Sequence, residues 1–205
     1  MPRVTHVKSA RKDNPVCSKG ESYYWWKFRF GGKHFSLTYP KQSQLTQSPY
    51  LSVIYDCQDT WGELSVAFEA AYKDREATVT GLGGVADSME SVAENLRELV
   101  EQYEESASNV EEYFPGSEQV ENLRNSGMEC DSTCDEIDNM VQSVRDTCDE
   151  ISGLELGEDF FLPEDADDDD KAAAKSDAIE AWDMEAQDLI DNIEFDDPNF
   201  DFHEV

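Results

Sequence analysis

Basic residues are scarce in this sequence. Of its 205 residues, 16 are Lys or Arg and 47 are Asp or Glu, which gives a formal net charge of −31. Long apolar runs are lacking as well. No stretch approaches the roughly 18–20 residues that cross a bilayer, and no apolar segment follows the basic N-terminal residues as it would in a signal peptide. We therefore expect a cytoplasmic protein that has no membrane partner.

Cysteine is also sparse, and the five cysteines form no recognisable framework. An odd number without a secretory signal argues against disulfides, so we expect reduced thiols. Cys17, His6 and His34 are conceivable metal ligands. However, no Cys-x-x-Cys pair accompanies them, and three scattered ligands fall short of a closed tetrahedral site. No acid is paired with a His in a recognisable motif, so the sequence predicts no metal, no cofactor and no enzymatic activity.

Charge divides the chain into two unequal parts. Residues 1–45 contain nine Lys or Arg and two acids, a net of +7, whereas the remaining 160 residues contain seven Lys or Arg and 45 acids, a net of −38. Such asymmetry indicates separate electrostatic roles. Solubility or adaptation to high salt would explain an acidic body, but neither explains why the first 45 residues escape the bias.

Residues 21–40, ESYYWWKFRFGGKHFSLTYP, predict a β-hairpin with a two-residue turn at Gly31-Gly32, which places Phe28 opposite Phe35. Side chains alternate between the two faces of such a ribbon. One face is then apolar, with Tyr24, Trp26, Phe28, Phe35, Leu37 and Tyr39. The other combines rings with cations, namely Tyr23, Trp25, Lys27, Arg29 and His34. A lone hairpin is marginal in water, so we expect the apolar face to pack on the following helix.

The face of rings and cations is suited to nucleic acid, because bases stack on aromatic rings and phosphates pair with Lys and Arg. Its five residues are therefore candidate nucleic-acid-binding residues. A basic arm before the hairpin adds Arg11 and Lys12, and arms of this kind contribute phosphate contacts that weaken with salt. An ordinary solvated strand face is the alternative. A third interpretation is binding to an acidic protein surface, including this protein's own body.

Apolar residues recur at alternating spacings of three and four in residues 50–71, 85–113 and 120–151, which is typical of a seam along a helix. Glycines at 81, 83 and 84 predict a break after the first helix, and Phe-Pro-Gly-Ser at 114–117 predicts a turn between the other two. Those two helices should form an antiparallel coiled coil, which also allows a homo-oligomer. Four cysteines fall in the seams and should be buried, namely Cys57, Cys130, Cys134 and Cys148.

The flanks of the predicted coiled coil are nearly all acidic, and Glu94, Glu98, Glu101 and Glu105 are our candidate residues for binding a basic or DNA-binding protein. Rows of carboxylates on a helix can imitate the phosphates of duplex DNA, which carries one charge per roughly 1.7 Å of axis. In composition the body resembles DNA-mimic inhibitors of DNA-binding enzymes. That resemblance assigns no residue roles.

The C-terminal part begins with an acidic segment at 155–170, whose composition predicts a disordered linker. A short amphipathic helix should follow, with its stripe at Ile179, Trp182, Ala186, Leu189 and Ile193. The last stretch, EFDDPNFDFHEV, mixes rings with acids and resembles the partner-recruiting terminal peptides of single-stranded-DNA-binding proteins. Phe200 and Phe202 are therefore candidate partner-binding residues.

The segment KGESYYWWKFRFGGKHFS, with the preceding RVTHVKSARKDNP, resembles the start of a group of small uncharacterised bacteriophage and bacterial proteins. The likeness covers about 45 residues. It implies a phage origin, hence the cytoplasm of a host cell, and supplies no activity and no site residues.

Together these patterns predict a mainly α protein with a two-stranded β-hairpin packed on a helix, an antiparallel helical hairpin and a partly disordered acidic tail. The expected domains are 1–45 (basic arm and aromatic hairpin), 46–80 (first helix and Gly-rich linker), 81–154 (acidic coiled-coil hairpin) and 155–205 (linker, short helix and tail). The predicted function is that of a non-enzymatic accessory protein, which contacts nucleic acid or a nucleoprotein through the hairpin and a protein through the coiled coil. The alternatives are a DNA-mimic inhibitor of a host enzyme and a structural coiled-coil component of a virion.

Overall fold

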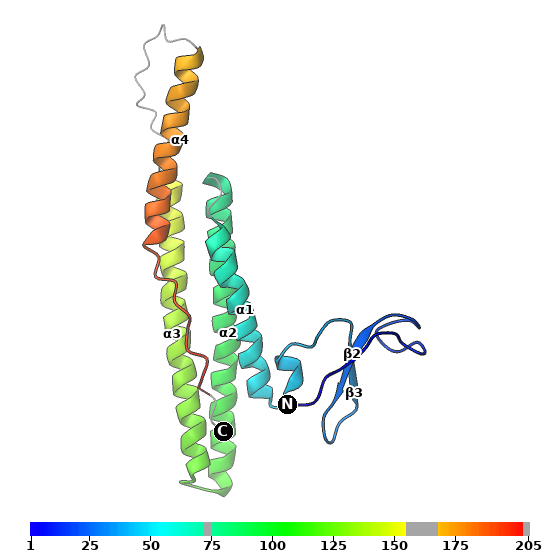
Figure 1. Cartoon of the computed structure of the whole chain (residues 1–205). Helices are drawn as coiled ribbons and strands as arrows, with labels where there is room; N and C mark the ends of the chain where they lie inside the picture. The colour runs from blue at the N-terminus through cyan, green and yellow to red at the C-terminus, as the bar shows by residue number, and fades with distance from the viewer. Residues whose placement is uncertain (72–74, 155–167, 203–205) are drawn as a thin grey trace. The chain divides into compact units, whose positions relative to one another are not determined.

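The computed structural model describes residues 1–71, 75–154 and 168–202, and the expected acidic linker lies largely outside these ranges. Two compact units divide the chain, Met1–Asp59 and Thr60–Phe202, which we call the N-terminal unit and the helical unit. The protein is mainly helical, with a small sheet near its N-terminus (Figure 1). Within the described residues, no helix combines the length and the apolar character needed to span a membrane.

The sheet of the N-terminal unit has three antiparallel strands, β1 (Thr5–Val7), β2 (Tyr23–Lys27) and β3 (Lys33–Ser36), in the order β1-β2-β3. The prediction of two strands preceded by an arm is therefore wrong. Thr5 pairs with Trp25, and Val7 pairs with Tyr23. A third strand supplies hydrogen bonds and side-chain contacts that a lone hairpin lacks. The strands contact one another, and packing of the sheet on the following helix stays a prediction.

The turn between β2 and β3 differs from the predicted one. Lys27 lies opposite Lys33, so residues 28–32 form the connection instead of Gly31 and Gly32 alone. Two-residue hairpin turns need positive φ at one or both central positions, and neither glycine has it. The N–H of Gly31 instead donates to the carbonyl oxygen of Phe28 at 3.3 Å. Compared with the predicted pairing, β3 is therefore shifted along β2 by an odd number of positions. Each β3 side chain consequently lies on the face opposite to the predicted one.

The segment between β1 and β2 is an ordered loop built around Asn14. The Asn14 Oδ1 accepts hydrogen bonds from the backbone N–H groups of Val16 (3.0 Å) and Cys17 (3.1 Å). At the base of the loop, the N–H of Ala10 donates to the carbonyl oxygen of Glu21, and Gly20 adopts a φ of +101°, which favours glycine. The basic residues of this segment thus lie on a folded loop that is tied to the sheet.

Four helices make up the rest of the described chain: α1 (Pro49–Ala71), α2 (Arg75–Tyr113), α3 (Glu118–Gly153) and α4 (Asp168–Asp191). Helices α2 and α3 pack side by side along their length (Figure 1). They are antiparallel, because Arg124 of α3 pairs with Glu111 of α2 whereas Arg145, further along α3, pairs with Glu90. The predicted turn at 114–117 joins them, with Gly116 at a φ of +74°.

The core of the helical unit follows the predicted seams of α2 and α3. On α3, all ten predicted positions are buried: Val120, Leu123, Gly127, Cys130, Cys134, Ile137, Val141, Val144, Cys148 and Ile151. On α2 the seam is buried from Val85 to Tyr103, but Tyr113 is 73% exposed because it lies at the end of the helix. A Cβ added at Gly127 would lie 3.4 Å from the Cβ of Tyr103, so the helices approach closely there. Supercoiling of the pair stays a prediction.

The expected break at the glycines is wrong, since α2 continues through Gly81, Gly83 and Gly84. Gly81 has a packing reason for being glycine. A Cβ at this position would lie 3.2 Å from the Cβ of Ala71 and 3.4 Å from its Cα, so the end of α1 passes against α2 at this point. Among the described residues, no atom outside the local turn of the helix lies within 4 Å of the Cβ positions of Gly83 and Gly84.

Helix α4 and the segment after it belong to the helical unit, and α4 contacts α3. The predicted stripe is buried at Trp182, Ala186 and Ile193, whereas Ile179 is 42% exposed. Beyond α4 the chain runs alongside the other helices (Figure 1). The Thr133 hydroxyl of α3 lies 3.0 Å from the carbonyl oxygen of Asn199, close enough to donate a hydrogen bond. The C-terminal segment is therefore packed on the helices as far as Phe202.

Candidate nucleic-acid interface

One face of the sheet gathers rings and cations, and we call it the aromatic-cationic face. Its rings and cations are Tyr23, Trp25, Lys27, Lys33 and Phe35, and Thr5 and Val7 of β1 lie beside them. The Nζ of Lys33 lies 4.4 Å from the centroid of the Trp25 ring, and the rings of Tyr23 and Phe35 are 6.0 Å apart. All three rings are half-buried, and both lysines are exposed. Such a face offers flat surfaces for stacking with positive charges beside them.

Strand β2 places three of the predicted residues on this face, because Tyr23, Trp25 and Lys27 alternate along a single strand. His34 is not among them. It pairs with Trp26 and stacks on that ring at a centroid distance of 5.5 Å, on the opposite face. The odd shift in the register of β3 causes this correction. The same shift brings in Lys33 and Phe35, which the sequence analysis missed.

The opposite face combines stacked pairs with one buried ring. Trp26 is 4% exposed, and its neighbour His34 also meets the Phe28 ring edge-on at 5.5 Å. His6 of β1 stacks on Tyr24 at 4.6 Å. Both histidines therefore pack against aromatic rings. Within the described part of the chain, no three His, Cys, Asp or Glu residues gather as metal ligands would.

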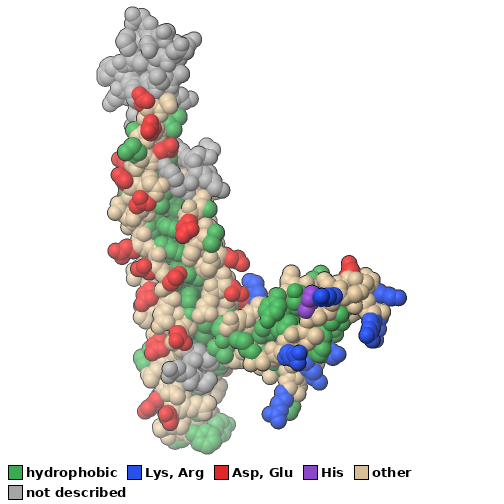
Figure 2. All heavy atoms as spheres, in the orientation of Figure 1, with side chains coloured by type: hydrophobic (Ala, Val, Ile, Leu, Met, Phe, Trp, Pro, Cys, Tyr) green, Lys and Arg blue, Asp and Glu red, His purple; other side chains and the backbone are tan. Residues whose placement is uncertain are grey.

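The remaining predicted cations lie in loops of the N-terminal unit. Arg29 is in the β2–β3 connection, where its guanidinium carbon lies 5.2 Å from the centroid of the Phe30 ring. Arg11 and Lys12 are exposed on the folded loop before β2. Figure 2 shows Lys and Arg side chains gathered over the N-terminal unit, and Asp and Glu side chains along the helices. The charge asymmetry of the sequence is therefore also an asymmetry between the two units.

The acidic candidates lie on α2. Glu94, Glu98, Glu101 and Glu105 are all exposed. Their spacings of four, three and four place them along one side of the helix. The ion pairs between α2 and α3 involve other acids, including Asp138, which accepts a hydrogen bond from Arg97. That hydrogen bond raises the pKa of the Arg97 guanidinium above its ordinary value.

Phe200 and Phe202 are not available to a partner in this structure. Phe200 is 9% exposed and Phe202 is 1% exposed. The ring of Phe200 meets Trp61 of α1 edge-on, at a centroid distance of 6.4 Å. As far as residue 202 the segment is packed on the helices with these rings buried, and a role of Phe200 and Phe202 in binding a partner stays a prediction.

All five cysteines are reduced and buried, and the seams predicted this burial for four of them. Cys130 and Cys134 lie one turn apart on α3, and the hydrogen bond from Cys130 lowers the pKa of the Cys134 thiol. Burial raises the pKa of the Cys148 thiol, which lies near the carbonyl oxygen of Val79. The opposite directions follow from the surroundings, since a donor stabilises a thiolate and loss of water destabilises it.

Comparison with protein-family models, with curated proteins and with solved structures finds no match to this chain. The likeness of its first 45 residues to phage and bacterial proteins stays a prediction. A functional assignment therefore depends on the chemistry of its surfaces.

Proposed function

We propose that the protein binds single-stranded nucleic acid through the aromatic-cationic face of its N-terminal sheet and is a non-enzymatic accessory protein. One observation carries the proposal: Lys33 lies 4.4 Å from the centre of the Trp25 ring, on a face that also presents Tyr23, Lys27 and Phe35. Unpaired bases expose flat surfaces that stack on such rings, and the lysines are placed to pair with the flanking phosphates.

Charge supports a polyanion as the ligand. The first 45 residues have a net charge of +7 in a chain whose net charge is −31. Selection for solubility alone would not separate the charges in this way. The folded loop with Arg11 and Lys12 extends the positive surface beyond the sheet, and each phosphate contact adds affinity that falls with salt.

The test is fluorescence anisotropy of the full chain with labelled 15-nucleotide single strands of DNA and RNA, with a duplex for comparison, at two salt concentrations. Trp25→Ala should weaken single-strand binding roughly tenfold or more, since stacking of a base contributes about 1–3 kcal/mol. Phe114→Ala is the matched control, because Phe114 is a ring 67% exposed in the helical unit. No binding at low salt, or equal affinities for wild type and Trp25→Ala, would refute the proposal.

Mimicry of DNA by the acidic helices is a second candidate, favoured by the exposed row of Glu94, Glu98, Glu101 and Glu105. A basic or DNA-binding protein would then bind the coiled coil that we propose α2 and α3 form. Immobilised protein should retain such a partner from the native host, and duplex DNA should release it. A variant with all four glutamates changed to glutamine should retain much less, and equal retention would exclude this row as the binding surface.

A further inference from the structure

A cavity in the N-terminal unit is separate from the aromatic-cationic face except for one shared residue. It measures about 510 Å³, within the roughly 300–1,000 Å³ typical of small-molecule sites. We call it the Arg29 cavity. The residues that carry the argument are Lys27, Phe28, Arg29, Leu45, Leu51 and Tyr55. They come from the end of β2, the β2–β3 connection, the short 3-10 helix η1 (Ser43–Leu45) and the first turns of α1.

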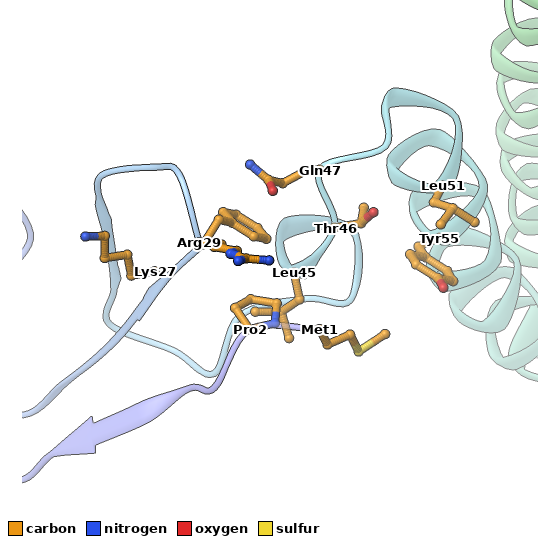
Figure 3. Close-up of a pocket in the computed structure, with 10 residues that line it drawn as sticks. Met1, Pro2, Lys27, Arg29, Leu45, Thr46, Gln47, Leu51 and Tyr55 are labelled. Carbon is orange, nitrogen blue, oxygen red and sulfur yellow. The ribbon is translucent and has the colours of Figure 1, made fainter.

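The charge of this lining is unusual for the chain. Its described residues include two cations and no Asp or Glu, although the sequence has 47 acids and 16 Lys or Arg. Figure 3 shows Arg29 in the middle of the lining, reaching toward Leu45, with Lys27 at the edge. A guanidinium in this position offers a planar set of donors that suits a phosphate.

The other side of the cavity is apolar and aromatic. Leu51 and Tyr55 project from the same side of α1, facing the end on which Leu45 and Arg29 lie (Figure 3). Leu45 of η1 is 7% exposed, so its side chain is packed in place within the lining of the cavity. This lining suits a ligand that combines an anionic group with a flat or apolar group. A nucleoside phosphate has both: a phosphate for Arg29 and a base for Tyr55 and Leu51.

We propose that the Arg29 cavity binds a nucleoside monophosphate unit, with its phosphate against Arg29 and its base against Leu45, Leu51 and Tyr55. The unit is either a free nucleotide or one nucleotide of a bound strand. Lys27 belongs to both the cavity and the aromatic-cationic face. A strand stacked on Trp25 can therefore place one nucleotide in the cavity, and for that source of the ligand the inference rests on the proposed function.

The experiment uses the full chain with its leucine methyl groups labelled for NMR. The probes are adenosine monophosphate, adenosine, inorganic phosphate and a 15-nucleotide single strand. Leu45 and Leu51 should shift on addition of adenosine monophosphate, and Leu123, which is buried in α3, should not. Adenosine and inorganic phosphate should each bind roughly tenfold or more weakly, because each lacks one of the two recognised groups.

Arg29→Gln removes the guanidinium charge from an exposed position and should not disturb folding. It should weaken binding of adenosine monophosphate roughly tenfold or more. Lys8→Gln is the control, since Lys8 is an exposed cation of the same unit outside the cavity lining, and the affinity of this variant for adenosine monophosphate should stay within about twofold of wild type.

The outcomes separate the cavity from the proposed function. Shifts of Leu45 and Leu51 with both the nucleotide and the strand, lost in Arg29→Gln, support a nucleotide of a bound strand. Shifts with adenosine monophosphate alone support a free nucleotide as the ligand. Strand binding with no shift of the two leucines on addition of any probe overturns the cavity and leaves the proposed function standing. No binding of any probe overturns both.

Discussion

The ring of Phe195, beyond the end of α4, stacks on the ring of Phe68 in α1 at a centroid distance of 4.6 Å and an interplanar angle of 13°. Trp61 lies on the same ring of Phe195, with centroids 5.4 Å apart. These contacts join residues that are more than 120 positions apart in the sequence. They fasten the C-terminal segment to the helical unit through apolar surface rather than through charge.

Phe195→Ala should lower the free energy of unfolding by about 1–2 kcal/mol, since the half-buried ring loses its stacking partners and part of its buried area. Met184→Ala is the control, because Met184 is 66% exposed on α4 and its loss should change stability little. Urea unfolding monitored by circular dichroism gives both values. Equal stabilities of the two variants would show that the stacked rings do not hold the segment.

Gly81→Ala and Gly84→Ala should differ in stability although both lie inside α2. An alanine at 84 meets open space and should stabilise the helix by about 0.5–1 kcal/mol. The same methyl at 81 would lie 3.2 Å from the Cβ of Ala71, so strain should offset the gain. Thermal unfolding should therefore rank Gly84→Ala above Gly81→Ala. The opposite order would contradict the close passage of α1 against α2.

The lysines of the aromatic-cationic face should set the salt dependence of strand binding. For single strands, log K falls with log salt by about 0.7 per phosphate contact. Lys27→Gln and Lys33→Gln should each reduce that slope by about this amount, whereas Trp25→Ala should weaken binding and leave the slope unchanged. Arg124→Gln, in the helical unit, controls for a general change in charge. If neither lysine variant alters the slope, phosphates are bound elsewhere.

Alkaline pH should destabilise the protein in part through Cys148. Burial raises the pKa of this thiol, so above the ordinary thiol pKa of about 8.5 the unfolded chain loses a proton that the folded chain keeps. This contribution is fully present below that pH and is lost as the pH rises through the folded-state pKa. Cys148→Ala should therefore show a smaller loss of unfolding free energy between neutral and alkaline pH than wild type does.

Cys134→Ala is the matched comparison, since the pKa of Cys134 is lowered in the folded protein. Here the folded chain releases its proton first, so this thiol adds stability as the pH rises toward the unfolded-state pKa. Its removal should enlarge the alkaline loss. Urea midpoints at two pH values measure both effects, and changes of the same sign in the two variants would contradict the assigned directions.

Local patterns anticipated the long elements well. The seam positions of α3 from Val120 to Ile151 are all buried. Apolar residues with this helical spacing lie on one face of a helix, and that face packs away from water. The turn at 114–117 was found for a similar reason, since a Pro-Gly pair ends a helix wherever it falls. The glycines of α2 do not end the helix as predicted, because a glycine weakens a helix but also permits close packing, as it does where Gly81 passes Ala71.

The candidate site was predicted only in part. Alternation along β2 is a local property, so Tyr23, Trp25 and Lys27 were correctly grouped on one face. The pairing of β3 depends on the turn, and its odd shift moved His34 away and brought Lys33 in. The Arg29 cavity had no signal in the sequence, because its walls come from segments that only the fold brings together.

The sequence by itself determined the separation of charge, the helical character of the body and the burial of its seams, because each depends on composition or on a period of a few residues. The tertiary structure alone decided the register of the sheet, the burial of Phe200 and Phe202 and the passage of Gly81 against Ala71. These depend on contacts between residues of different elements, and such contacts stabilise the chain only once folding has brought those elements together.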